Sequence, residues 1–274
     1  MKRLIGVMAM LTLGCSAGYA QVVTFSSDTS KQVVATAEVP YAKPKPPKPP
    51  KPIVHEISFG FRLNTNGWSI YSDYGKLKTN DLKHVDMSHN VFFLQTEFTE
   101  KKDPKEQKIH SQTITGSGTS TYIYGKINNL YVLKLGLGYR KQLAGKPESG
   151  CVSIHWATTG GFALGMLKPY YITLAGSSQS IKYSDLNQSD FLDQQNIQGS
   201  AGFSKGLGEM QFIPGGHLKT ALHFDFSANK KNVIGVEAGV NAEFYSQPIM
   251  LMANEKSTTS FIDLFVAFQF GRRW

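Results

Sequence analysis

Apolar and polar residues alternate along most of the chain from Ile53 onward, with the period of two that is typical of β-strands. In the segment 55–65, for example, large apolar side chains alternate with glycine and with polar or charged residues. Turn-forming pairs such as Asn66-Gly67 separate the alternating segments. The pattern predicts an all-β chain with about ten strands. The candidate strands are residues 55–65, 67–77, 90–100, 120–127, 130–142, 151–158, 161–170, 217–227, 232–246 and 259–271.

Two architectures produce this alternation: a soluble sandwich, which buries its apolar faces, and a transmembrane barrel, which turns them towards lipid. The candidate strands have roughly the 9–11 residues that a tilted strand needs to cross a bilayer. Glycine shares the polar face of one strand with Lys134 and Arg140, which suits a crowded lumen. The last strand leads to the aromatic Trp274, like the assembly signal of outer-membrane barrels, although Arg272 interrupts its phase. We therefore predict an antiparallel transmembrane β-barrel over residues 53–274, with the soluble sandwich as the alternative.

The number of strands determines which connections lie on each side of the membrane. Bacterial single-chain barrels have an even strand number with both termini in the periplasm, so ten strands are expected and eight to twelve are compatible. Eight would result if residues 55–77 or 120–142 formed one bent strand. Ten strands direct four longer connections outward and leave three short links on the periplasmic side. The short link 64–66 on the outer side and the longer link 78–89 on the periplasmic side are exceptions. The outward connections are 100–119, 143–150, 171–216 and 247–258, and the periplasmic links are 128–129, 159–160 and 228–231.

The first 20 residues have the organisation of a secretory signal peptide: a basic start, an apolar stretch, and small residues before a cleavage site after Ala20. A weak lipobox ends at Cys15, so lipidation of this cysteine is the competing route of processing. Either route leaves Cys151 as the last unmodified cysteine, which excludes an intramolecular disulfide. We expect the mature protein in the outer membrane of a Gram-negative bacterium.

A Lys/Pro-rich segment over residues 43–52 precedes the barrel and belongs to an extended periplasmic arm, residues 21–52. The segment holds six of the twelve prolines, which favour an extended polyproline II spacer of about 3.1 Å per residue. A solvated linker is the simplest interpretation. The alternative is contact with peptidoglycan or with an acidic periplasmic partner. The lysines available for such contact are Lys43, Lys45, Lys48 and Lys51.

Composition narrows the class of protein further. Only 18% of the residues are charged, while 26 glycines, 17 phenylalanines and 12 tyrosines accompany them. Beyond the first 20 residues there is no apolar stretch of about 18 residues, which excludes a helical membrane protein. A mean hydropathy of −0.23 is compatible with a barrel, because one face of every strand is polar. The net charge of +9 falls partly on the arm, and we expect no nucleic-acid partner.

Inward-facing charges of both signs predict a lumen network of ion pairs. A barrel of eight to ten strands is narrow enough for side chains to fill it. An unpaired buried charge is costly, so opposite charges should pair there. The network favours a plugged barrel over a porin. Its expected members are Glu97, Lys134, Arg140, Glu237 and Glu243.

Motifs for catalysis are absent from the sequence: it has no phosphate-binding loop, zinc-ligand spacing or nucleophile elbow. We therefore expect no enzymatic activity, no cofactor and no metal. Ser153 and His155 share one face of a candidate strand and are the one candidate for a lipid-modifying site. Hydrogen-bonded lumen filling is the simpler interpretation of these two residues.

Two segments are candidate partner surfaces. The connection 171–216 is long for a structureless loop, and such length usually indicates function or an independent fold. Met250 and Met252 lie in a second connection and are expected to form an exposed contact patch. Anchoring at the membrane interface is the alternative for these methionines.

Several short motifs resemble a family of Bacteroidetes-type outer-membrane β-barrel proteins that has no assigned enzymatic activity. The motifs are residues 124–129, 135–140, 168–171, 202–206, 214–217, 237–240 and 270–274. The resemblance implies a barrel in the outer membrane and membership of an envelope assembly, such as a secretion or barrel-insertion machine. We therefore expect a non-enzymatic structural or accessory subunit that contacts lipids and other envelope proteins. A small-solute channel is the first alternative, and a lipid-modifying enzyme is the second.

Overall fold

The computed structural model describes residues 53–78, 90–112, 119–146, 150–176, 179–229, 231–253 and 255–274. The signal peptide and the arm, including Lys43, Lys45, Lys48 and Lys51, lie outside the described residues. In the described ranges, no helix is long and apolar enough to cross a membrane.

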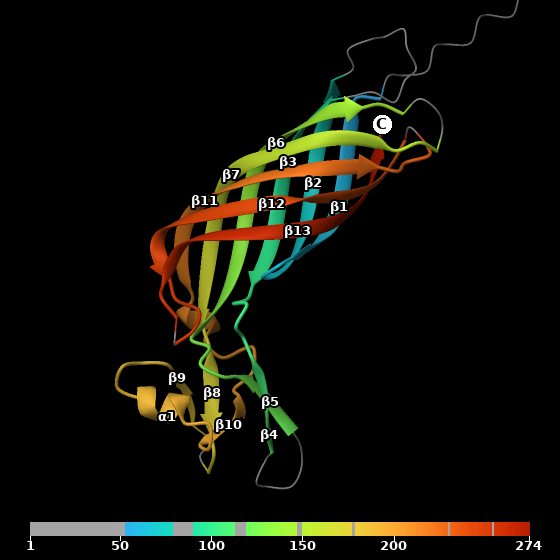
Figure 1. The fold of residues 1–274 in the computed structure, drawn as a ribbon. Helices are drawn as coiled ribbons and strands as arrows, with labels where there is room; N and C mark the ends of the chain where they lie inside the picture. The colour runs from blue at the N-terminus through green and yellow to red at the C-terminus, as the bar shows by residue number, and fades with distance from the viewer. Residues whose placement is uncertain are drawn as a thin grey trace, which may run out of the picture. The chain divides into compact units, whose positions relative to one another are not determined.

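Eight antiparallel strands close into a barrel (Figure 1). The predicted antiparallel barrel is confirmed, with eight strands where ten were expected and eight to twelve were compatible. Their order around the barrel is β1-β13-β12-β11-β7-β6-β3-β2, so the first and last strands pair and close the sheet. The strands are β1 (His55–Asn64), β2 (Gly67–Lys78), β3 (Asn90–Lys101), β6 (Asn128–Ala144), β7 (Ser153–Pro169), β11 (Gln211–Asp225), β12 (Asn232–Ile249) and β13 (Thr258–Arg273).

The alternation seen in the sequence separates an apolar outer surface from a polar interior. On β1, Phe59 exposes 60% of its surface, whereas the inward-facing Glu56 and Arg62 each expose 1%. On β13, Phe268 and Phe270 likewise face outward. A soluble sandwich would bury the apolar faces, so this arrangement rules that alternative out and defines a transmembrane β-barrel.

The barrel has eight strands instead of the ten candidates, for two local reasons. β7 continues through Gly160 and Gly161 without a turn, because Gly161 pairs with a glycine on β6 at the same level. Residues 119–123 form β5, which pairs outside the barrel with β4 (Lys108–Gln112). As a result, neither 159–160 nor 128–129 is a link between barrel strands. The connection 143–150 was expected on the outward side. Its described residues outside β6, 145–146 and 150, lie at the barrel end that carries the C-terminus, because β6 ends and β7 begins there (Figure 1).

The glycine pair gives a first testable prediction. A Cβ atom on Gly161 would lie 2.2 Å from the carbonyl oxygen of Leu135, whereas a Cβ on Gly160 would have its closest contact, to Leu218, at 3.5 Å. Gly161→Ala is therefore expected to destabilise the barrel by about 2 kcal/mol through overpacking, and Gly160→Ala by much less. Urea titration of each variant in lipid vesicles measures the difference. Equal stabilities of the two variants would contradict the close strand contact.

A second folded part lies at the end of the barrel opposite the C-terminus (Figure 1). It consists of the described residues of the connections 102–127 and 170–210, and we call it the cap. β4 and β5 form a hairpin, while three other strands form a sheet in the order β10-β8-β9. The remaining cap elements are β8 (Tyr171–Leu174), β9 (Ser180–Lys182), α1 (Gln188–Leu192), β10 (Ile197–Ser200) and η1 (Leu207–Glu209).

Candidate functional site

Ion pairs fill the part of the lumen nearest the cap. Lys134 Nζ lies 3.0 Å from Glu97 Oε1 and 2.6 Å from Glu243 Oε1. Glu97 also pairs with Arg62, and Glu243 lies 3.3 Å from Lys101 Nζ. The structure therefore brings together three of the five residues expected in a lumen network, namely Glu97, Lys134 and Glu243.

The other two expected residues, Arg140 and Glu237, lie in neighbouring groups of the same interior. Arg140 Nη1 donates to Glu56 Oε1 at 2.9 Å, and Arg273 Nε donates to the other oxygen of Glu56 at 2.7 Å. Glu237 Oε1 is 3.5 Å from Lys219 Nζ. The five residues of these groups lie on five different strands, β1, β6, β11, β12 and β13, so distant parts of the chain contribute charges to a shared interior.

Sequence reasoning missed several members of this interior, although the signal was present. Each missed residue occupies an inward position of an alternating strand and is at most 3% exposed. A charge at an inward phase was therefore a sufficient signal by itself. The missed charged residues are Glu56, Arg62, Asp73, Lys101, Lys219, Asp225, Asp263 and Arg273.

Aromatic rings shield one buried cation. The guanidinium carbon of Arg62 lies 4.6 Å from the ring centroid of Tyr71 and 4.5 Å from that of Phe265. Gly60 makes room for the Tyr71 ring, because a Cβ at this glycine would lie 2.2 Å from a ring carbon. Cation–π contacts and ion pairs together offset the loss of hydration that burial imposes on Arg62.

Apolar side chains close the lumen at the end that faces the cap. Residues of four barrel strands pack there with the β12–β13 connection. The main chain joins this connection to the segment before β6: Ile127 N–H donates to Leu251 at 2.8 Å, and Ala253 N–H donates to Gly125 at 2.7 Å. The cluster consists of Leu130, Val132, Ala163, Leu167, Ile213, Tyr245, Ile249, Leu251 and Met252.

The expected methionine patch is wrong for one of its two residues. Met250 is 39% exposed, but Met252 is only 8% exposed and belongs to the apolar cluster at the barrel mouth. The reason is that Met252 forms a β-bridge with Lys126, which turns its side chain into the mouth. The two methionines therefore do not share a surface.

The filled interior has a direct chemical consequence. Arg62, Lys101 and Arg140 are each 1% exposed, although a water-filled channel would leave such long charged side chains accessible. A barrel of eight strands has an interior just wide enough for side chains to fill. The arrangement stabilises a closed barrel and leaves these cations without contact to bulk water.

The Ser153 and His155 pair also lies inside the lumen, where each residue is 1% exposed. The His155 ring lies 5.9 Å from that of His223, whose Nδ1 is 3.7 Å from Glu237 Oε2. Lipid on the outer surface has no access to these side chains. Across the described part of the chain, no group of three or more His, Cys, Asp or Glu residues could hold a metal ion.

The cap has a hydrophobic core of its own. Tyr122, Ile172, Phe191 and Ile197 are each at most 3% exposed and form one cluster. Tyr183 packs edge-on against Phe191 with ring centroids 5.5 Å apart. The described residues of 170–210 thus fold against the β4–β5 hairpin, whereas residues 211–216 of the expected connection 171–216 belong to barrel strand β11.

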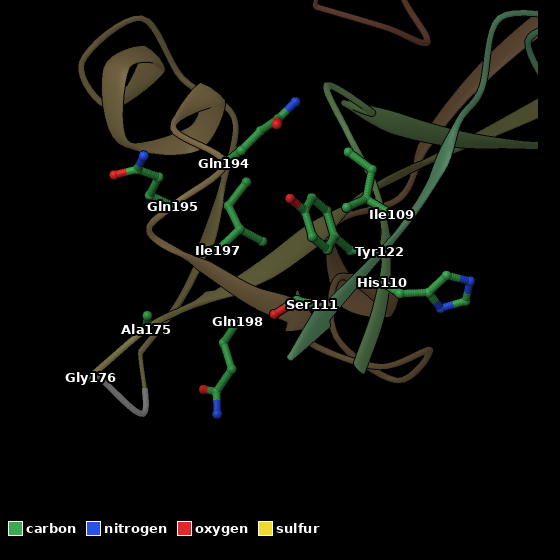
Figure 2. A pocket seen from close by; sticks show the side chains of 10 residues that line it. All are labelled: Ile109, His110, Ser111, Tyr122, Ala175, Gly176, Gln194, Gln195, Ile197 and Gln198. Atoms are coloured by element: carbon green, nitrogen blue, oxygen red, sulfur yellow. The ribbon is translucent and has the colours of Figure 1, made fainter. Parts of the chain in front are cut away.

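A pocket of about 460 Å³ opens between the hairpin and the sheet of the cap (Figure 2). Ile109, Tyr122 and Ile197 supply apolar wall, and the main polar groups nearby are the amides of three glutamines. No carboxylate or ammonium group lines it among the described residues. A pocket with this lining suits an uncharged ligand that carries hydrogen-bonding groups. The glutamines are Gln194, Gln195 and Gln198.

Hydrogen bonds on the surface of the cap join η1 to the sheet formed by β10, β8 and β9. Glu209 of η1 accepts hydrogen bonds from Lys182 at 2.5 Å and from Tyr171 at 2.7 Å, and these bonds lower the pKa of Glu209. Three large apolar side chains of the cap are exposed: Leu186 at 98%, Phe203 at 67% and Leu207 at 43%. The Phe203 ring also contacts the barrel, at 6.3 Å from the ring of Tyr131 and 4.2 Å from Lys168 Nζ.

Among the comparisons with known proteins, only the comparison with solved structures finds proteins similar to this chain. No protein-family model matches the chain, and no curated protein matches it. The N-terminal β-barrel domain of Pseudomonas aeruginosa OprF is 11% identical, with 80% of this chain and 96% of that chain covered and a TM-score of 0.34.

Two further solved structures show similarity of the same order. Neisserial surface protein A is 8% identical, with 81% and 95% coverage and a TM-score of 0.35. Yersinia pestis Ail is 10% identical, with 82% and 100% coverage and a TM-score of 0.35. All three are outer-membrane β-barrel proteins. Similarity at this level assigns no ligand or partner to the present chain.

Proposed function

We propose that this protein is a non-enzymatic barrel of the Gram-negative outer membrane that serves as a structural or accessory subunit of an envelope assembly. Its barrel anchors the chain, and its cap contacts other envelope proteins. The Bacteroidetes-type family suggested by the sequence motifs is part of the same proposal, as is a periplasmic position of the Lys/Pro-rich arm.

One observation carries the proposal: the lumen is filled while the cap is folded. Ion pairs and the apolar cluster occupy the barrel interior, so the barrel offers no evident route for solutes. At the barrel end opposite the C-terminus, the described residues of the connections 102–127 and 170–210 form the cap, which has its own hydrophobic core and exposed apolar side chains. Long folded connections on a membrane anchor usually have a function.

Planar bilayer recordings separate this proposal from a small-solute channel. The wild-type barrel is expected to give no discrete conductance, because the cations of the lumen are paired and inaccessible to water. A reproducible conductance of the purified barrel would favour the channel alternative instead.

Native purification tests the subunit role. The wild-type protein in mild detergent is expected to migrate as a defined complex, and Leu186→Asp should weaken that complex because this side chain is almost fully exposed on the cap. Lys205→Asp, also an exposed cap position, is the control for an added carboxylate. A monomeric wild-type protein, with unchanged envelope function after gene deletion, would contradict the proposal.

The enzymatic alternative has one candidate site to test. His155→Ala is expected to leave the lipid profile of the envelope unchanged, because the imidazole is buried in the lumen. A changed lipid profile, with normal insertion of the variant, would favour a lipid-modifying enzyme.

A further inference from the structure

A basic pocket of about 320 Å³ lies at the end of the barrel opposite the cap. It is formed where the end of β13 meets the connection between β11 and β12. Arg273 N–H donates to the carbonyl oxygen of Lys231 at 2.6 Å, which holds these two segments together. The lining residues are Lys231, Arg272, Arg273 and Trp274.

The cations of this pocket differ in their partners. Arg273 turns inward, where its Nε lies 2.7 Å from Glu56 Oε2 and its Nη2 lies 2.8 Å from Asp225 Oδ2. Arg272 faces outward, and neither it nor Lys231 forms an ion pair within the part of the chain that the structure describes. Among the described residues, no side-chain carboxylate forms an ion pair with the two positive charges of Arg272 and Lys231.

Four ion pairs between described residues hold the carboxylates of Glu56 and Asp225 in the lumen at this barrel end. Glu56 bonds to Arg140 and Arg273, and Asp225 bonds to Arg273 and to Lys146 at 3.1 Å. The main-chain oxygen of Trp274 accepts hydrogen bonds from the N–H groups of Val54 and His55, each at 2.9 Å. The carboxylates of Glu56 and Asp225 and the main-chain oxygen of Trp274 are therefore bound to groups other than the Arg272 side chain.

The pocket occupies the level at which a bilayer changes from hydrocarbon to head groups. Outward positions of β13 are apolar up to Phe270, and Arg272 is the next outward position. Trp274 is 51% exposed, and its ring lies 6.0 Å from that of His55, which stacks on Tyr74. Aromatic residues gather at the membrane–water interface in transmembrane barrels.

We propose that Arg272 and Lys231 bind the phosphate of an anionic phospholipid head group at this end of the barrel. A guanidinium and an ammonium group both donate hydrogen bonds to phosphate oxygens, and the acyl chains would lie along the apolar outer face of β13. Two unneutralised cations favour a net-negative lipid, because a zwitterionic lipid brings a positive group into the same pocket. The proposal needs a membrane-embedded barrel but not the assembly role proposed above.

Native mass spectrometry of the detergent-solubilised protein tests this site with phosphatidylglycerol as the probe. The double variant Arg272→Gln with Lys231→Gln is expected to bind this lipid about tenfold more weakly than wild type. Phosphatidylcholine and inorganic phosphate should bind wild type much more weakly than phosphatidylglycerol does. The control removes two exposed cap lysines, Lys108→Gln with Lys205→Gln, and thus makes the same change of net charge.

Each outcome of this experiment is decisive. Equal binding of phosphatidylglycerol by the double variant and wild type would overturn the proposal, as would an equal loss of binding in the cap control. Binding of phosphatidylcholine with the same affinity would exclude selection for an anionic lipid. Equal binding of inorganic phosphate would replace the lipid by a free anion. Lys231→Gln alone, in an exposed connection, provides the comparison if the double variant does not fold.

Discussion

Replacing Glu97 by glutamine is expected to lower the free energy of unfolding of the barrel by about 3 kcal/mol. The substitution keeps the shape of the side chain but removes the negative charge between Arg62 and Lys134. Loss of one partner leaves a buried cation uncompensated, which costs about 3–5 kcal/mol in typical cases. The lower end applies here, because Lys134 keeps Glu243 as a partner.

Urea titration in lipid vesicles measures this loss. Thr96→Val provides a matched control on the same strand, because Thr96 is the preceding residue and faces outward. We expect this control to change the stability by less than about 0.5 kcal/mol. Equal stabilities of Glu97→Gln and wild type would mean that the lumen ion pairs contribute no net stability.

Phe191→Ala is expected to unfold the cap while the barrel stays intact. Phe191 is 1% exposed at the centre of the cap core, and removal of a buried phenylalanine costs about 3–5 kcal/mol. A core of this size cannot absorb such a loss, whereas the barrel is held by its own closed hydrogen-bonded sheet. Limited proteolysis should therefore cut the variant within residues 170–210.

Phe203→Ala is the control for this prediction, because Phe203 also belongs to the cap but is 67% exposed. Its protease resistance should resemble that of wild type. The heat-dependent gel migration of the barrel should be the same in all three proteins. Loss of the folded barrel in Phe191→Ala would show that the cap and the barrel unfold as one unit.

Alternation predicted the strands and the phase of most of their side chains. Strand length, the charged and glycine-containing polar faces and the aromatic Trp274 were needed to favour a barrel over a soluble sandwich. Side chains in a strand point to opposite faces in turn, so one charged residue at a known phase assigns its neighbours as well. Glu97 and Lys134 were assigned to the lumen in this way, and the structure places them 3.0 Å apart. Arg62 follows the same rule within the expected strand 55–65, whereas Lys101 lies one residue beyond the expected strand 90–100 and belongs to β3 in the structure.

Strand number and the position of connections depended on contacts between distant segments. Gly160-Gly161 has the composition of a turn, but cross-strand pairing with Gly136 keeps it inside one long strand. Residues 119–123 alternate like a barrel strand, yet they pair with residues 108–112 in the cap. The local pattern cannot tell a turn from a glycine pair within a strand, nor a barrel strand from a cap strand. A strand has the same alternating geometry in either sheet.

The sequence by itself determined that the chain is all-β, that its apolar side faces outward and that charges of both signs fill its interior. The all-β character follows from the period of two, which is local and needs no knowledge of the partner strand. The outward direction of the apolar side rests in addition on strand length and on the charges and glycines of the opposite face. Only the tertiary structure decided that eight strands close the barrel, that Met252 is buried in its mouth and that two connections fold into a cap. The physical reason is that strand pairing and core packing join residues far apart in the chain, and their free energies depend on which segments meet.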